Sequence, residues 1–174
     1  MHDALAAVAR VINGINEGIG RAVAWTALAL VATQFLAVVL RYVFGMGWIW
    51  VEESIVYLHA TLFMAGAAYT LLHDGHVRVD VFYREATARD RARVDLLGTV
   101  FFLWPVSILI LVKGWPYVAQ SWAVLERSPE TSGIPAVFVL KSLIPVFAVL
   151  MVAQGASMAA SAILVMLGRT DSAR

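Results

Sequence analysis

The stretch RYVFGMGWIWVEESIVYLHATLFMAGAAYTLLHDGHVRVDVFY, residues 41–83, decides the fold of this chain. Its middle, residues 54–72, is a nearly uninterrupted apolar run. At about 1.5 Å of rise per helical residue, this run covers the hydrocarbon core of a bilayer. We therefore expect a transmembrane helix here, with Glu52 and Glu53 in its first turn, where unpaired backbone amides favour negative charge. Because Arg41 ends the preceding apolar run, we expect it to meet these acids at one membrane face.

The composition places the whole chain in the same class. Of its 174 residues, 61% are hydrophobic and 14% are charged, which is far too apolar for an ordinary soluble domain. A net charge of +1 gives no reason to expect nucleic acid as a partner. The chain contains no cysteine, which excludes disulfides, thiolate nucleophiles and cysteine-ligated metal sites. We therefore expect an integral membrane protein whose surroundings are the lipid bilayer.

Apolar runs divide the chain into one all-α membrane domain, residues 1–174, with four transmembrane helices. The expected spans are about 22–40, 54–72, 96–112 and 142–167. Residues 3–20 carry apolar side chains at spacings of three and four with polar ones between. We expect this segment to be an amphipathic helix lying in the membrane interface, the alternative being an extension of the first span. We do not expect a cleavable signal peptide, because the apolar run begins only at Ala22.

Polar and small residues inside the spans predict contacts between helices. Gln34 is expected to hydrogen-bond a neighbouring helix, because an amide left bare in lipid is costly. Small residues gather at 65–68 and at 155–161, where they let helix backbones approach closely. Pro105 has no amide hydrogen and is expected to kink the third span. The spans therefore have the character of packing elements.

The distribution of lysine and arginine predicts the orientation. Nine of these residues lie in the two terminal segments and the middle loop, and four lie on the opposite side. The positive-inside rule then puts both termini and the middle loop in the cytoplasm. The connector SPETSGIP, residues 128–135, falls on the other side of the membrane.

Four side chains after the second span have the chemistry of metal ligands: His73, Asp74, His76 and Asp80. Their spacing matches no helical ligand pair, and the alternation of valines with charged residues indicates an extended segment instead. A haem held by two histidines needs them on facing spans, and only His59 lies inside a span. We therefore expect no metal or cofactor site, and we interpret His59 as a packing residue.

The adjacent carboxylates of Glu52 and Glu53 do not suggest catalysis. Neighbouring side chains on a helix point about 100° apart, so they cannot easily converge on one reacting centre. One is expected to pair with Arg41 or a partner chain, and the other to face headgroups or water. No acid lies near the middle of a span, where proton-coupled transport by this chain alone would need one. We expect no enzyme activity.

Four motifs occur in one order along the chain: RYVF at 41–44, WVEE at 50–53, GAAY at 66–69 and GHVRVD at 75–80. Together they resemble the small membrane subunit, the DctQ type, of tripartite ATP-independent periplasmic (TRAP) transporters, and the resemblance extends over nearly the whole chain. In TRAP systems a periplasmic binding protein (DctP type) delivers an organic acid to a large membrane subunit (DctM type). The large subunit moves the acid inward by an elevator motion driven by sodium. The resemblance implies a scaffold in the bacterial inner membrane that contacts neither substrate nor sodium.

The candidate partner-interface or structural residues are Arg41, Trp50, Glu52, Glu53, Gly66, His76, Arg78 and Asp80. Those at 41–53 are expected to hold the outer ends of the first two spans together or to bind the large subunit, and those at 76–80 to shape the cytoplasmic face. Glu126 and Glu130 are candidates for docking the binding protein. The alternative function is a free-standing, small homo-oligomeric channel or exporter.

Overall fold

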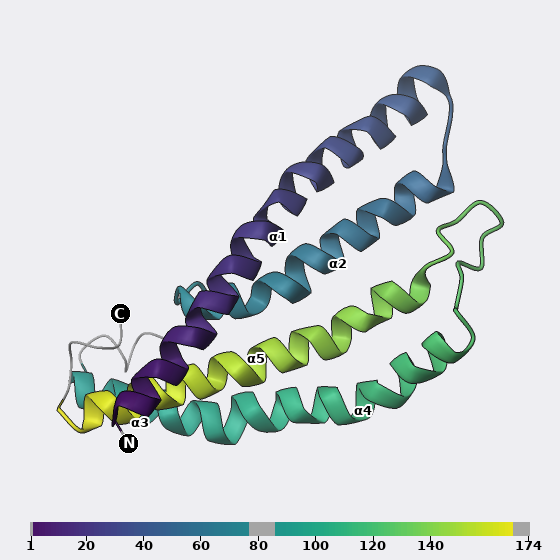
Figure 1. Ribbon diagram of the computed structural model, residues 1–174. Coiled ribbons are helices and arrows are strands. Elements are labelled where there is room, and N and C mark those ends of the chain that lie inside the picture. Colours follow the sequence, from purple (N-terminus) through teal and green to yellow (C-terminus); the bar gives the residue numbers. More distant parts are fainter. Residues whose placement is uncertain (1, 77–85, 169–174) are drawn as a thin grey trace.

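The computed structural model of this chain describes residues 2–76 and 86–168, which are helical apart from short loops. In order, the elements are α1 (His2–Phe44), α2 (Ile49–Leu72), α3 (Ala88–Gly98), the π-helical turn η1 (Thr99–Leu103), α4 (Trp104–Ala123) and α5 (Val137–Met166). Because α3, η1 and α4 follow without a break, the described residues form four helices that are long and apolar enough to cross a membrane. The all-α membrane fold is confirmed, and Figure 1 shows α1 beside α2 and α4 beside α5.

We use two names for the ends of the molecule. The loop end carries the α1–α2 loop, residues 45–48, and the α4–α5 connector, residues 124–136. The terminal end is where α1 begins and α5 finishes, and the Asn16–Gln154 contact brings those two helices together there. Toward the loop end, α1 diverges from α4 and α5, whereas α2 stays beside α5 (Figure 1).

The first helix is longer than the sequence predicts. Residues 3–20 and 22–40, expected as an interfacial helix and a separate span, form one uninterrupted helix. Its 43 residues correspond to about 65 Å, roughly twice the thickness of the hydrocarbon core. The amphipathic pattern is real, but its polar side packs on α5: Asn16 is 2% exposed, whereas Val11 is 62% exposed. The asparagines of this segment therefore face α5, while Val11 and Ile15 point away from the protein.

The last helix, α5, is the centre of the fold. Among the described elements, α5 contacts all the others, while α4 contacts only α5 and η1. The buried residues of α5 are mostly small: Ala148, Met151, Gln154, Gly155, Ser157, Ala159, Ala160, Ala162 and Leu164. Such residues allow backbones to approach closely in lipid. The expected packing face at 155–161 is thus present, and it is buried against this chain's own helices.

The crossing of α4 and α5 depends on Gly155. A Cβ at this position would lie 2.6 Å from Nε1 of Trp104, so only glycine leaves room for the indole. That Nε1 donates a hydrogen bond to the carbonyl of Val152 at 3.1 Å. Immediately before Pro105, the amide of Trp104 bonds back to the carbonyl of Thr99, which makes the π-helical turn. The sequence predicted a kink at Pro105. The structure instead has this wider turn just before Pro105, whose ring nitrogen has no hydrogen to donate to the helix.

Candidate functional site

An ion pair joins α1 and α2 at the loop end. The guanidinium of Arg41, in the last turn of α1, donates to the carboxylate of Glu52, in the first turn of α2. The two side chains are 57% and 49% exposed, so the pair contributes under about 1 kcal/mol. Between them the chain turns through Gly45, whose φ of +67° is readily adopted by glycine. The expected cluster of Arg41 with an acid is therefore present, and the acid is Glu52.

Glu53 connects the two helix pairs. Its carboxylate accepts hydrogen bonds from the backbone amide of Ile134, at 2.6 Å, and from the hydroxyl of Ser128. Both donors belong to the α4–α5 connector, far along the chain. Gly133 makes room for this contact, since a Cβ there would lie 2.7 Å from Oε1 of Glu53. The carboxylate expected to face headgroups or water instead fastens the start of α2 to the connector.

A second ion pair closes the base of the connector. The ammonium of Lys141 pairs with the carboxylate of Glu126 and lies 4.0 Å from the ring centroid of Tyr117, a cation–π contact. This ammonium holds the pKa of Glu126 below its ordinary value. Of the two docking candidates, Glu126 is therefore engaged within the chain, whereas Glu130 is exposed. Only the second presents its carboxylate freely at the surface.

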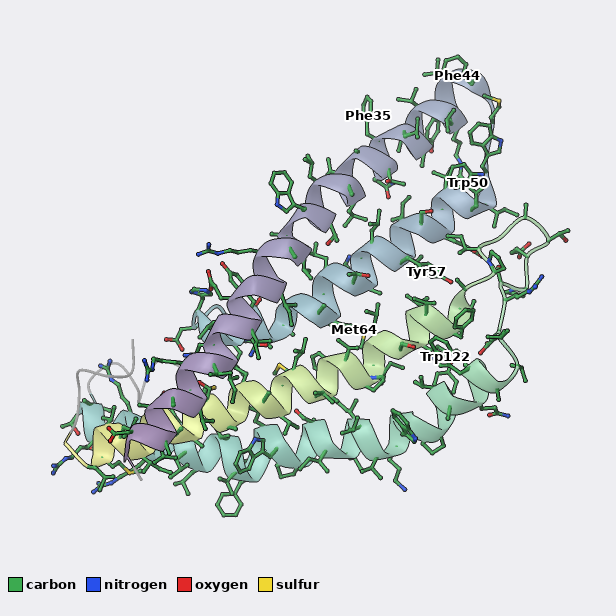
Figure 2. All side chains as sticks on the ribbon, viewed as in Figure 1. Phe35, Phe44, Trp50, Tyr57, Met64 and Trp122 are labelled. Atoms are coloured by element: carbon green, nitrogen blue, oxygen red, sulfur yellow. The ribbon has the colours of Figure 1, made fainter. Side chains whose placement is uncertain are left out.

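Aromatic side chains gather at the loop end. Trp48 and Trp50 stack with ring centroids 6.0 Å apart, and both are about half exposed. Figure 2 labels Phe44 and Trp50 at this end, and Phe44 is 62% exposed. Amphipathic rings of this kind are typical of the headgroup region of a bilayer. The sequence candidate Trp50 thus lies among exposed aromatic side chains. Its indole makes no hydrogen bond with any described residue.

At the terminal end, α1 and α2 are joined by a polar contact and a close crossing. The carboxylate of Glu17 contacts Nε2 of His73 and Nε of Arg21, each at 2.7 Å. Beside them Gly20 faces Tyr69, and a Cβ on this glycine would lie 2.1 Å from Cγ of the ring. The Tyr69 ring also lies against the His73 ring, with centroids 4.4 Å apart. These contacts set the distance between the two helices.

The remaining sequence candidates have differing outcomes. Gly66 lies on the α1–α2 contact, where an added Cβ would be 3.8 Å from Cγ1 of Val23, an ordinary packing distance. His76 is exposed. Arg78 and Asp80 lie outside the described residues, so their role stays a prediction. Within residues 2–76 and 86–168, no group of three histidines or acids is arranged to hold a metal ion.

A buried polar network between α1 and α5 was missed by the sequence argument. Asn16 donates to Oε1 of Gln154 at 2.7 Å, and the hydroxyl of Ser157 donates to Oδ1 of Asn13 at 2.6 Å. Gln154 completes the ring of contacts with a longer bond to Asn13, at 3.4 Å. The signal was present, because each helix contributes two polar residues three positions apart, on one helical face. Placing the asparagines in the membrane interface concealed it.

Gln34 does not behave as expected within the chain. Its side chain is exposed, and it makes no hydrogen bond with any described residue, although a bond to a neighbouring helix was predicted. His59, on α2, is also exposed and borders the same groove. Asn13 and Asn16 of α1 instead make interhelical hydrogen bonds, with Gln154 and Ser157 of α5.

Comparison of the sequence with known proteins gives a family match and a similar curated protein. The family model "Tripartite ATP-independent periplasmic transporters, DctQ component" matches residues 30–165. A similar curated protein is the C4-dicarboxylate TRAP transporter small permease protein DctQ of Vibrio cholerae serotype O1 (strain ATCC 39315 / El Tor Inaba N16961). The two are 32% identical over 110 residues, which cover 62% of this chain and 45% of the relative. The match thus spans under half of the relative's length. No solved structure gives a significant match.

Proposed function

This chain belongs to the DctQ family of TRAP transporter components, and on that premise we propose that it is a scaffold subunit that packs against a large permease subunit. The arrangement of charge carries the proposal. In the described residues, no lysine, arginine, aspartate or glutamate lies between Arg21 and Arg41 of α1, between Ser54 and Leu72 of α2, or within the second half of α5. A solute path for an anion needs charged groups at mid-membrane. The chain offers packing surfaces there instead.

The buried polar network supports the same role. The amide groups of Asn16 and Gln154 bond to each other, and Asn13 is bonded to Ser157. Groups that satisfy one another in this way hold two helices together and are not themselves free to bind a solute. The function is therefore to provide a fixed helical frame, while transport itself belongs to the large subunit.

We place the terminal end in the cytoplasm and the loop end in the periplasm of a bacterial inner membrane. The excess of lysine and arginine in the terminal segments and the middle loop supports this orientation. The part of α1 that crosses lies between Arg21 and Arg41, which are about 30 Å apart along the helix, the thickness of one hydrocarbon core. The loop end then faces the compartment of the binding protein.

The transporter would take up an organic acid, driven by sodium, from a periplasmic binding protein. The name of the Vibrio cholerae relative specifies C4-dicarboxylates for that protein. For this chain we propose the wider class of organic acids. We assign docking of the binding protein to residues 128–135 of the α4–α5 connector. Glu53 holds this segment in place, and Glu130 supplies its free carboxylate.

Reconstitution into liposomes tests this function. Proteoliposomes that contain this chain, the large subunit and the binding protein should accumulate an organic acid under an inward sodium gradient. Liposomes with this chain alone should accumulate none, and accumulation there would refute the scaffold role in favour of a free-standing transporter.

Substitutions at the loop end test how the scaffold works. Replacing Arg41, Glu52 and Glu53 together by alanine should reduce both co-purification of the large subunit and uptake, because the loop end loses the ion pair and the connector contact. Lys113→Ala, an exposed charge on α4, is the matched control and should leave both unchanged. If the triple variant behaves like this control, the role assigned to the loop end is wrong.

A further inference from the structure

A groove runs between α1 and α2 on a face that no other described helix covers. It has a volume of about 550 Å³ and is walled mainly by exposed apolar side chains of α1, with Ile55 on the α2 side. Phe35, which lines it, is 69% exposed, and Val31 is 66% exposed. Two polar side chains interrupt these walls: Gln34 from α1 and His59 from α2.

The two polar side chains lie at the same depth. Gln34 is seven residues before Arg41, and His59 is seven residues after Glu52, so each lies about 10 Å along its helix from the loop end. Because Arg41 and Glu52 are ion-paired, those two reference points are at one level. With the Arg41–Glu52 pair at the boundary of the hydrocarbon layer, Gln34 and His59 both lie well inside that layer.

Neither side chain has a hydrogen-bond partner among the described residues. Other polar groups on these helices do: Thr33 bonds to the carbonyl of Ala29 at 2.8 Å, and Thr61 to that of Tyr57 at 2.8 Å. The His59 ring is stacked on Phe63, with centroids 6.4 Å apart, which orients the imidazole without satisfying its nitrogens. An amide and an imidazole are thus left facing lipid, where acyl chains offer neither donor nor acceptor.

The chemistry of these groups defines what they need. The amide of Gln34 both donates and accepts, and a neutral imidazole has one donor and one acceptor nitrogen. A side chain that can also do both, from serine, threonine, asparagine or glutamine, would satisfy them. In a membrane such a side chain is delivered by another helix, and hydrogen bonds of this kind join transmembrane helices.

We infer that this groove is the seat of a transmembrane helix of the large subunit, which presents a hydrogen-bonding side chain to Gln34 and His59. The inference rests on the proposed function, since membership of a multi-component transporter is what supplies a second membrane polypeptide. The apolar walls, with Phe35 and Val31, pack against that helix, and the two polar groups fix its depth.

Site-directed photo-crosslinking in the intact complex tests the placement. The chain has no cysteine, so a single Phe35→Cys can be labelled with a benzophenone maleimide without other changes. Phe102→Cys, on η1 and 74% exposed, is the matched control. Illumination should join Phe35→Cys to the large subunit and leave the control uncoupled to it. A product from Phe35→Cys that contains two copies of this chain, or only lipid, would overturn the inference.

Substitution of the polar groups tests the hydrogen bonds. Gln34→Leu with His59→Leu should weaken association with the large subunit about tenfold, as expected for the loss of two interhelical hydrogen bonds. Thr33→Val is the control, because that hydroxyl is satisfied within its own helix. Unchanged association in the double variant would refute the assigned hydrogen bonds. If the unaltered chain fails to bring down the large subunit at all, the proposed function has failed, whereas normal co-purification without Phe35 crosslinking refutes the groove alone.

Discussion

Replacing Gly20 by alanine should separate α1 from α2 at the terminal end. The added Cβ would lie 2.1 Å from Cγ and 2.5 Å from Cβ of Tyr69, which are the atoms of that side chain nearest its backbone. A ring cannot swing away from a clash at its own base. Its other side is occupied by His73, whose ring centroid is 4.4 Å from that of Tyr69. Relief therefore requires the two helices to move apart by more than 1 Å, which disturbs the Glu17–His73 contact as well.

The magnitude follows from two opposing terms. Overpacking of this kind costs about 1–3 kcal/mol. Alanine in place of a helical glycine recovers up to about 1 kcal/mol of propensity. Gly18→Ala gains the same propensity two residues away, where nothing lies within 4 Å of the added Cβ. The difference between the two variants thus isolates the packing cost, and Gly20→Ala should be less stable than Gly18→Ala by about 1–3 kcal/mol.

The assay is reversible unfolding of the purified protein in mixed micelles of rising dodecyl sulfate fraction, followed by circular dichroism. Once Tyr69 is replaced by alanine, the clashing ring is gone. Adding Gly20→Ala to Tyr69→Ala should therefore cost much less stability than Gly20→Ala costs in the unaltered chain, because neighbouring sites couple. Equal stability of Gly18→Ala and Gly20→Ala would refute the reasoning, and so would strictly additive effects in the double variant.

Three further predictions concern the polar contacts. Glu53→Ala should cost about 1–3 kcal/mol and speed proteolysis of the connector, because an amide and a hydroxyl lose their acceptor. Gln154→Leu should lower the unfolding midpoint by a similar free energy, because the buried amide of Asn16 is left unpaired. The bond of Glu126 to Lys141 requires the charged carboxylate. Glu126 should therefore stabilise the fold above pH 4.5, the ordinary pKa of its carboxyl group, and this stability should be lost as the pH falls through the lowered pKa of the folded protein.

Each of these has a matched comparison. Glu52→Ala removes only an exposed ion pair and should cost under about 1 kcal/mol, so equal proteolysis in Glu52→Ala and Glu53→Ala would contradict the connector contact. Gln120→Leu replaces an exposed amide and should leave the midpoint nearly unchanged. For the acid range, unfolding of Glu126→Gln measured from pH 3 to 7 should lack the titration of the unaltered chain, and identical pH profiles would exclude the effect.

The parts of the fold that follow from hydropathy and charge were accessible from the sequence. The span at 54–72 and the pairing of Arg41 with Glu52 depend on residues close together along one hairpin. The sequence left two readings of residues 3–20 open, an interfacial helix or an extension of the first span. It could not choose between them, because hydropathy reports where a helix meets lipid and says little about whether it continues through Arg21. Of the two glycines just before Arg21, Gly18 faces open space and Gly20 faces the Tyr69 ring.

Contacts between distant segments were the hardest to foresee. The bond from Ile134 to Glu53 joins positions 81 residues apart, and nothing local in either segment specifies the other. The network between α1 and α5 joins positions 138 residues apart, although its matching three-residue spacings gave a usable signal. For Arg78 and Asp80 the sequence motif remains the whole basis of their assignment.

The central place of α5 has a consequence for biosynthesis. A ribosome completes α1, α2 and the α3–α4 rod before α5, yet the described parts of α1 and α2 make no close backbone contact with α3 or α4. The nascent chain therefore enters the bilayer as two pieces that do not yet adhere, with the amides of Asn13 and Asn16 uncovered. Translation of the final long helix is the event that joins them, and a translational stop before Val137 would leave the earlier helices for membrane quality-control proteases.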